Sequence, residues 1–372
     1  TVADPFLTFS AEAARIYSYW AVRRPLSLYM TTYGLMKGLQ AFGEWAFFED
    51  DEERKKLTDP QRKNAMARMQ ASAPAWRRSG YLAPQMPWGQ LGLGDPEEGD
   101  ASVLDLDLPL VERFLVEFIH EEVRRRRGFD KVVLGVSGGV DSAVALYLAC
   151  KALGAENVHG FRLPYATSSQ SSLDDGALVL EASGAQARTI DITAAVDGYI
   201  ETHEPEISGH RRGHVAARIR AVTLFDQAFK LGGLPLGTGN KSERLLGYYT
   251  WHADDSPPIN PLGDLFKTQV WALARQLGVQ SRVVDKPASA DLVEGIHDED
   301  ELGISYRKAD LILHWLLRGY QPEELAGYGF DGREVELVRN RLNATHWKRE
   351  LPTVAVLSSS AIGEFYLRPV DY

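Results

Sequence analysis

The sequence predicts an α/β fold, a doubly wound parallel sheet with a helical C-terminal part and a small helical N-terminal extension. Strand and helix patterns alternate between residues 131 and 236, as in parallel sheets, and helical patterns dominate after residue 264. The run at 131–136 is apolar and β-branched without polar alternation, which indicates a strand buried on both faces. The expected strands lie at 131–136, 157–163, 186–191 and 234–236. The expected helices lie at 108–127, 140–153, 173–183, 196–202, 212–230, 264–277, 305–318, 322–327 and 331–344.

Residues 1–100 differ from the rest and predict a helical extension followed by a linker. Helical patterns, the first two rich in aromatic residues, cover 12–20, 26–47 and 59–71. Pro and Gly punctuate 80–100 before an acidic run, as in a linker. The main domain is therefore expected at 101–372. The aromatic side chains are expected to pack in a core or at a subunit interface. The sequence leaves open whether the extension enlarges such an interface or lies over a site.

The helix expected at 108–127 is amphipathic and ends in the basic run Arg124–Arg127. This run suits the negative end of the helix dipole, which predicts a solvated helix end rather than a binding site. The net charge of −10 likewise argues against a nucleic-acid partner. No apolar run approaches the roughly 20 residues that span a bilayer. The start of the sequence carries no secretory signal pattern, so no membrane partner is expected.

The chain has one cysteine, Cys150, within the helix expected at 140–153. A single cysteine excludes a disulfide within the chain and any cysteine-based zinc or iron–sulfur site. Its apolar neighbours predict a small buried side chain rather than a nucleophile. Together with the composition, this cysteine usage predicts a cytoplasmic enzyme.

A glycine-rich turn joins the strand at 131–136 to the next helix. Glycine lets backbone N–H groups approach a ligand, and the N-terminus of the helix favours an anion. Asp141 would repel phosphates there unless a divalent cation bridged them. The turn therefore predicts a site for a nucleoside triphosphate with Mg²⁺, without the lysine of a Walker A loop. Its residues are Ser137, Gly138, Gly139, Val140, Asp141 and Ser142.

Three further segments follow expected strands or open helices, where an open α/β sheet binds its ligands. Arg162 ends the second strand and suits a phosphate or a carboxylate; the alternative is a pair with a surface carboxylate. Glu243 suits a second oxygen ligand for Mg²⁺, or is simply a favourable acid in a first helical turn. Lys267 lies in the first turn of a helix, where the dipole disfavours it, which suggests an anionic partner. Asp264 is a candidate N-cap of that helix.

The glycine-rich turn resembles the pyrophosphate-binding loop of the N-type ATP pyrophosphatases. Six further motifs are similar, in order, to those of ammonia-dependent NAD synthetases, at 237–243, 247–250, 260–268, 287–292, 298–303 and 346–349. The resemblance implies an adenine nucleotide alpha hydrolase-like fold. It also implies a ligase that converts deamido-NAD, ATP and ammonia into NAD, AMP and pyrophosphate through an adenylated carboxylate, the last step of NAD biosynthesis.

The resemblance also implies roles for residues at matching positions. ATP contacts are expected from Ser137, Gly138, Gly139, Val140, Asp141, Ser142, Arg162, Thr238, Lys267 and Ser289. Contacts with deamido-NAD are expected from Arg212, Tyr248, Asp254, His346, Lys348 and Arg349. The Mg²⁺ positions are Asp141, Glu243 and Ser289. The catalytic residues are Asp141, Lys267 and Asp254, with Asp254 the hypothetical proton acceptor for ammonium.

Two positions depart from the family pattern, namely Pro258, where an aspartate is usual, and His214, where an asparagine is frequent. They are the only support for one alternative, a nucleotide-binding module with reduced catalysis. The other alternative is another adenylating amidotransferase of the GMP-synthetase kind, against which the motifs at 237–243 and 346–349 speak. The N-terminal segment has no cysteine that could hydrolyse glutamine, so direct use of ammonia is expected. The resemblance implies a homodimer. A separate glutaminase partner is compatible with the sequence, although nothing in it indicates one.

Overall fold

The computed structural model describes residues 96–289 and 297–350. The predicted N-terminal extension therefore lies outside the described residues, except for 96–100. None of the described helices is both long and apolar enough to cross a membrane.

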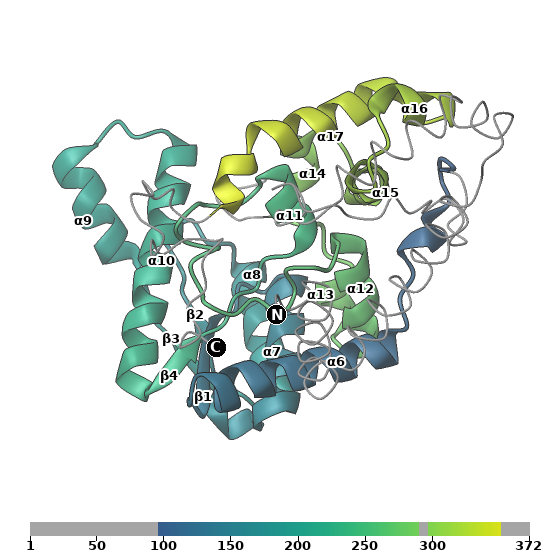
Figure 1. The fold of residues 1–372 in the computed structure, drawn as a ribbon. Helices are drawn as coiled ribbons and strands as arrows, with labels where there is room; N and C mark the ends of the chain where they lie inside the picture. Colours follow the sequence, from purple (N-terminus) through teal and green to yellow (C-terminus); the bar gives the residue numbers. More distant parts are fainter. Residues whose placement is uncertain (1–95, 290–296, 351–372) are drawn as a thin grey trace, which may run out of the picture. The chain divides into compact units, whose positions relative to one another are not determined.

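The described part contains one parallel sheet of four strands, in the order β3-β2-β1-β4, which confirms the predicted fold class (Figure 1). The chain runs outward from β1 through β2 to β3 and then returns to place β4 on the other side of β1. The strand order thus reverses beside β1, and open α/β sheets bind ligands at such a reversal. The strands are β1 (Lys131–Gly135), β2 (Val158–Arg162), β3 (Gln186–Thr189) and β4 (Gly233–Pro235).

The central strand is buried on both faces, as its sequence predicts. Val132, Val133 and Leu134 are fully buried. Val132 and Leu134 face the larger apolar core, and Val133 faces the smaller one, because successive residues of a strand point to opposite faces. Helices α6, α7, α12 and α13 contribute to the larger core, and α9 and α10 to the smaller (Figure 1).

The helices confirm most of the predicted elements with shifted ends. Helix α7 matches its prediction at both ends, while the helix predicted at 108–127 is α-helical only to His120 and continues as a π-helical turn, Glu121–Arg126. The described α-helices are α6 (Leu108–His120), α7 (Val140–Leu153), α8 (Gln170–Ser183), α9 (Thr193–His203), α10 (Gly209–Leu231), α11 (Lys241–Leu246), α12 (Lys267–Gln276), α13 (Ser281–Val284), α14 (Asp298–Leu302), α15 (Tyr306–Leu317), α16 (Pro322–Gly327) and α17 (Gly332–Ala344).

The start of α12 differs from the prediction, and Asp264 is not its N-cap. The backbone before Lys267 forms turns instead of a helix, with Leu265 N–H donating to the carbonyl of Leu262. The N-cap is Phe266, and the Asp264 carboxylate, 96% exposed, accepts a hydrogen bond from Lys241 Nζ at 2.7 Å. Lys267 is therefore the first helical residue rather than a later one.

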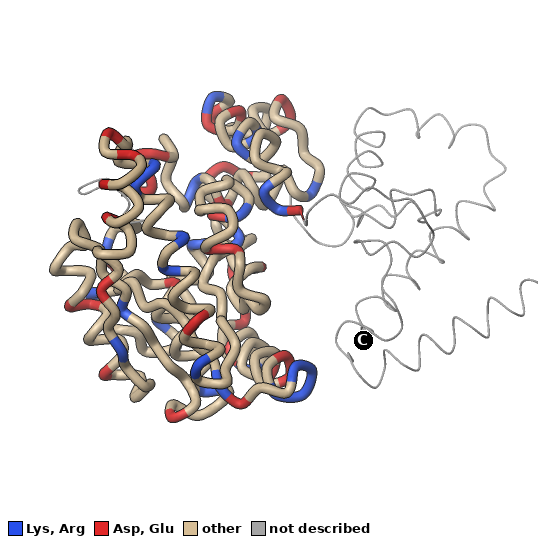
Figure 2. The backbone as a smooth tube through the Cα atoms, turned by 90° about the vertical axis from the view of Figure 1, so that its left-hand side faces the viewer, with Lys and Arg blue, Asp and Glu red and all other residues tan. Residues whose placement is uncertain are grey.

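Basic and acidic residue positions alternate along the described backbone (Figure 2). The basic run after α6 pairs with acids of its own helical segment, Arg125 with Glu121 at 2.9 Å and Arg126 with Glu122 at 3.1 Å. This arrangement agrees with the prediction of a solvated helix end. Cys150 is half-buried against the larger core rather than fully buried, and burial raises the pKa of its thiol to about 11. The thiol is therefore neutral near pH 7, unlike a nucleophile.

Candidate active site

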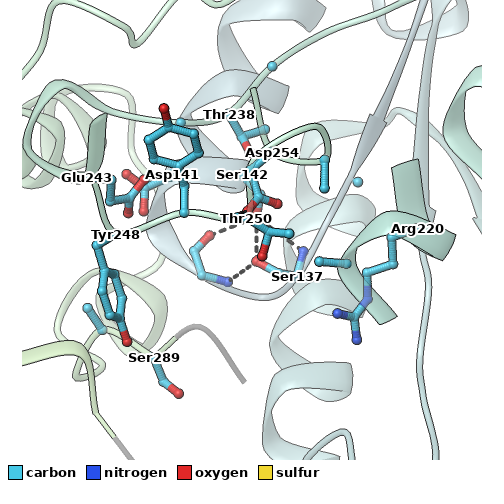
Figure 3. Close-up of a pocket in the computed structure, with 18 of the residues that line it drawn as sticks. Ser137, Asp141, Ser142, Arg220, Thr238, Glu243, Tyr248, Thr250, Asp254 and Ser289 are labelled. Atoms are coloured by element: carbon cyan, nitrogen blue, oxygen red, sulfur yellow. Dashed lines mark hydrogen bonds between the residues drawn. The ribbon is translucent and has the colours of Figure 1, made fainter. Parts of the chain in front are cut away.

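A cavity of about 640 Å³ opens beyond the carboxyl ends of β1, β2 and β4. Its wall includes the glycine-rich turn after β1, the end of β2 and the segment after β4 (Figure 3). It therefore lies where the strand order reverses, and the sequence motifs at consecutive strand ends do meet in space.

The glycine-rich turn is shaped by a position that admits only glycine. Gly138 has φ 83°, and a Cβ there would lie 2.3 Å from the carbonyl oxygen of Ser172 on α8. The turn is closed by Ser142, whose Oγ donates to the carbonyl of Gly139 at 2.9 Å and accepts from Ser137 N–H at 3.3 Å. The N-cap of α7, Gly139, provides no side chain to its first turn. The N-terminus of α7 thus stays available to an anion in the cavity.

Lys267 joins two of the three predicted metal positions, Asp141 and Glu243. Its Nζ lies 2.6 Å from Asp141 Oδ2 on α7 and 3.1 Å from Glu243 Oε1 on α11, and its side chain is only 3% exposed. Both carboxylates and the lysine line the cavity. The dipole mismatch at the start of α12 is therefore offset by two carboxylates from other helices.

Asn240 explains why the two carboxylates come together. It is fully buried and caps α11. Asn240 Oδ1 accepts a hydrogen bond from Glu243 N–H at 2.9 Å, and Asn240 N–H donates to Glu243 Oε2 at 3.3 Å. Its Nδ2 donates to Asp141 Oδ1 at 2.8 Å. Glu243 is thus a favourable first-turn acid, and it is also a partner of Lys267.

The charges of this cluster shift the pKa of two of its members. Burial alone would lower the pKa of the Lys267 ammonium, but Asp141 and Glu243 outweigh it and raise that pKa. Burial raises the pKa of Glu243 to about 7, since the attraction of Lys267 offsets only part of the lost hydration and of the repulsion by Asp141 and Asp298. The cluster thus carries more negative than positive charge when every carboxyl group is ionised.

The same carboxylates fit a magnesium ion. Mg²⁺ is held in nucleotide sites by one or two carboxylates together with phosphate oxygens and waters. Asp141 and Glu243 already enclose one cation, the Lys267 ammonium, between their oxygens. Among the described residues, no three His, Cys, Asp or Glu side chains form a metal cluster by themselves. Ser289 also lines the cavity, but in Figure 3 it lies apart from Asp141 and Glu243.

The remaining residues expected to contact ATP also lie at the cavity. Thr238 and Arg162 are in its wall, together with the turn residues except Gly138. Arg162 donates through Nη1 to the carbonyl of Leu173 at 3.4 Å rather than pairing with a surface carboxylate, and its buried Nε has no hydrogen-bond partner within the described ranges.

The residues expected to contact deamido-NAD divide into two groups. Tyr248, Asp254 and Lys348 line the cavity, whereas Arg212, His346 and Arg349 do not. Arg349 is instead engaged with backbone carbonyls, donating to Arg244 at 3.2 Å and to Leu342 at 2.7 Å. His346 is exposed and its Nδ1 lies 2.7 Å from the carbonyl of Asn343. Arg349 thus joins α11 to α17.

Asp254 is open to the cavity yet surrounded by protein atoms, and this desolvation raises the pKa of its carboxyl group. Its Oδ2 accepts from Thr250 N–H at 2.7 Å. The unusual His214 lies on the same side, with Nδ1 2.9 Å from Thr250 Oγ1. Burial first, and then nearby cations, lower the pKa of His214, so its imidazole is neutral near pH 7. Of the two departures from the family pattern, His214 lines the cavity and Pro258 does not.

Sequence reasoning missed several basic residues in the wall of the cavity. These are His210 and Arg220 on α10, Arg244 on α11, Lys286 after α13, and Arg341 on α17. They come from separate elements and share no local motif, so no pattern could have found them. The signal for Asn240 was present, since it lies within the motif at 237–243, but its bond to Asp141 crosses 99 residues of sequence.

A parallel sheet with this glycine-rich turn at its reversal point defines the class of protein, an α/β enzyme of the ATP pyrophosphatase type. The NAD synthase family model matches residues 111–352. An NH(3)-dependent NAD(+) synthetase of Chlorobaculum parvum is 44% identical over 261 residues, 70% of this chain and 94% of that protein. The chain belongs to the NAD synthase family.

Solved structures agree with this assignment. An NMN synthetase from Francisella tularensis superimposes with a TM-score of 0.60 at 27% identity, covering 68% of this chain and 99% of that one. An NH3-dependent NAD synthetase from Campylobacter jejuni, in complex with a nitrate ion, gives a TM-score of 0.58 at 29% identity, covering 68% of this chain and 100% of that one.

Proposed function

We propose that this protein converts deamido-NAD, ATP and ammonia into NAD, AMP and pyrophosphate, acting as a ligase that forms a C–N bond. The observation that carries the proposal is Lys267, held between Asp141 and Glu243 beside the glycine-rich turn, in a member of the NAD synthase family. ATP is the co-substrate. The nicotinate carboxylate is anionic and a poor electrophile, so transfer of AMP to it creates a mixed anhydride with a good leaving group.

The first half-reaction depends on the turn and on Lys267. The N–H groups at the start of α7 bind phosphate oxygens, and Gly138 allows their close approach. The Lys267 ammonium offsets the charge that develops on the departing pyrophosphate. Mg²⁺, when bound, adds positive charge at the phosphates, and Asp141 and Glu243 are the residues that would hold it. Ser289, which also lines the cavity, is the third proposed ligand.

The second half-reaction needs ammonia rather than ammonium. Asp254 accepts the proton, because its raised pKa brings the carboxylate closer to the working pH and Thr250 N–H fixes one of its oxygens. Tyr248 and Lys348 complete this side of the cavity. Tyr248 OH donates to Glu301, and Lys348 Nζ donates to the carbonyls of Gly247 at 2.7 Å and Tyr249 at 2.6 Å. These bonds hold the segment that carries Tyr248 against the substrate site.

The nitrogen donor is proposed to be free ammonia. The one cysteine, Cys150, belongs to α7 and packs against the apolar core, so it is not placed to attack glutamine. A separate glutaminase that supplies ammonia remains compatible with this proposal.

The active form is proposed to be a homodimer in the cytoplasm, where ATP is available. Helix α10 carries an exposed apolar face, with Val222, Phe225 and Phe229 at helical spacing and Phe229 91% exposed. Exposed apolar faces of this kind mark subunit contacts. Sedimentation of the purified protein gives the mass of the particle, and a monomer at assay concentration would contradict the proposed homodimer.

The activity test uses the purified chain with ATP, Mg²⁺, ammonium and deamido-NAD, and measures both pyrophosphate and NAD. We expect equal amounts of the two products. Xanthosine monophosphate in place of deamido-NAD tests the GMP-synthetase alternative, and nicotinate mononucleotide tests amidation of the smaller substrate. Absence of pyrophosphate with every acceptor would leave only the nucleotide-binding module. Efficient turnover with glutamine as the sole donor would contradict the use of free ammonia.

A further inference from the structure

Asp310 is a fully buried carboxylate on α15 that does not line the cavity. Its side chain accepts hydrogen bonds from Ser242 Oγ, from Thr268 N–H at 2.9 Å and from Thr268 Oγ1 at 2.8 Å. A carboxylate taken out of water without such donors would be strongly unfavourable. The three donors come from the first residues of α11 and α12, the two helices that carry Glu243 and Lys267.

These bonds replace the missing cap of α12. Phe266, the N-cap, provides no side-chain acceptor. The first helical N–H, that of Lys267, donates instead to Ser242 Oγ at 2.8 Å, and the second, that of Thr268, donates to Asp310 Oδ2. Open N–H groups at a helix start need acceptors, and a carboxylate there also suits the helix dipole. Asp310 therefore caps α12 from a different helix, directly and through Ser242.

The same helix also touches the Lys267 side chain. Tyr306 lies one helical turn before Asp310 on α15, and its ring centroid lies 5.3 Å from Lys267 Nζ. Tyr306 is itself fixed, since its N–H donates to Glu299 at 2.7 Å and its OH to Asp298 at 3.2 Å. Helix α15 thus holds the backbone of Lys267 through Asp310 and Ser242. It also places the ring of Tyr306 against the Lys267 ammonium.

We propose that Asp310 is a positioning residue for Lys267, which fixes the start of α12 so that the ammonium stays between Asp141 and Glu243. Asp310 itself touches neither substrate nor the reacting atoms. The proposal rests on the proposed function of Lys267 in the release of pyrophosphate. The competing explanation is that Asp310 only joins three helices and contributes to stability.

The variant Asp310→Asn keeps the size of the side chain but replaces one acceptor oxygen by a donor among groups that donate. We expect kcat for pyrophosphate release to fall about 10- to 100-fold, with KM for deamido-NAD unchanged, because a small displacement of a catalytic group has effects of this size. In a Lys267→Ala background, the same substitution should reduce kcat less than about 2-fold, since its effect acts through Lys267. Equal losses in both backgrounds, or an unchanged kcat in the single variant, would overturn the proposal.

Leu313→Ala is the matched control, because Leu313 is fully buried on the same helix without a hydrogen bond to α12. It should lower the urea midpoint while kcat stays within about 2-fold of the parent. If it lowers kcat as much as Asp310→Asn does, general loosening of α15 explains the effect and the positioning role is wrong.

A second readout does not depend on activity. The rate at which an amine-reactive acylating reagent labels Lys267, followed by peptide mass spectrometry, reports how firmly this lysine is held. We expect Asp310→Asn to raise the labelling rate of Lys267 several-fold and to leave that of Lys241 unchanged; an unchanged rate at Lys267 contradicts the proposal. If Lys267→Ala keeps full activity, the proposed function of Lys267 fails, while the labelling result still decides whether Asp310 holds it.

Discussion

Replacing Lys267 by Met tests the centre of the proposed site. The substitution keeps an unbranched side chain of similar length and removes the cation that contacts Asp141 at 2.6 Å and Glu243 at 3.1 Å. Removing one partner of a buried ion pair typically destabilises a protein by about 3–5 kcal/mol. We expect about 3 kcal/mol here, because a proton on Glu243, whose pKa is raised to about 7, relieves part of the repulsion between the two carboxylates.

The loss of activity should exceed what the loss of stability explains. Removing one group that stabilises developing negative charge lowers kcat by about 100- to 1000-fold. The assay is pyrophosphate release at saturating ATP and deamido-NAD, at a urea concentration and temperature where unfolding curves show the variant to be folded. A kcat within about 5-fold of the parent would refute the assignment of Lys267 to the leaving group.

Lys241→Met is the matched control for this prediction. Lys241 opens the neighbouring helix and pairs with the exposed Asp264 at 2.7 Å, but it does not line the cavity. Exposed ion pairs contribute about 0–1 kcal/mol, so both the unfolding free energy and kcat should stay close to the parent values. A large loss of kcat in this control would mean that Lys267 acts only through the overall positive charge near the turn, and not through its contacts with Asp141 and Glu243.

Three further predictions concern other parts of the site. Gly138→Ala should lose about 2–3 kcal/mol of stability and weaken ATP binding in calorimetry, because the residue has φ 83° and a Cβ there would lie 2.3 Å from Ser172 O. An unchanged affinity for ATP would contradict the contact between this turn and the phosphates. Asp254→Asn should lower kcat/KM for ammonium about 100-fold or more near neutral pH, because the variant has lost its proton acceptor and depends on the small fraction of unprotonated ammonia. The activity that remains should rise steadily with pH, whereas full activity near neutral pH would contradict this role of Asp254. His214→Asn should keep the hydrogen bond to Thr250 Oγ1 and most of the activity, whereas His214→Leu should lose both. The measurement is KM for deamido-NAD, which should rise in the Leu variant and stay close to the parent value in the Asn variant.

The sequence is informative where one local pattern contains both the fold and the chemistry. The run at 131–136, the glycines and the helix after them form one continuous signal, and the structure reproduces it with β1, the turn and α7. Lys267 is a different case, because apart from the family resemblance only the mismatch between its charge and the helix dipole indicated a function. The structure explains the mismatch through carboxylates 126 and 24 residues away along the chain.

Residues whose function depends on distant partners escape this kind of reasoning. Arg349 lies in a basic motif, yet its guanidinium donates to carbonyls of Arg244, 105 residues away, and of Leu342. The boundary of α12 was wrong for a similar reason, since Asp264 looks like a cap in sequence while the acceptors for the first N–H groups come from Ser242 and Asp310. Local propensity cannot reveal a cap that another helix supplies.

The charges around Lys267 explain why this lysine and two carboxylates are enclosed together. A cation at the start of a helix is unfavourable, and so are two carboxylates enclosed beside each other. Asp141, Glu243 and Lys267 reduce both penalties together, but one negative charge is left over when both carboxyl groups are ionised. Burial first, and then repulsion by Asp141 and Asp298, raises the pKa of Glu243 to about 7 although Lys267 opposes the shift. A site that keeps an excess of negative charge in the free protein favours a further cation. Asp141 and Glu243 would hold such a cation, and the Lys267 ammonium beside them would offset negative charge on phosphate oxygens.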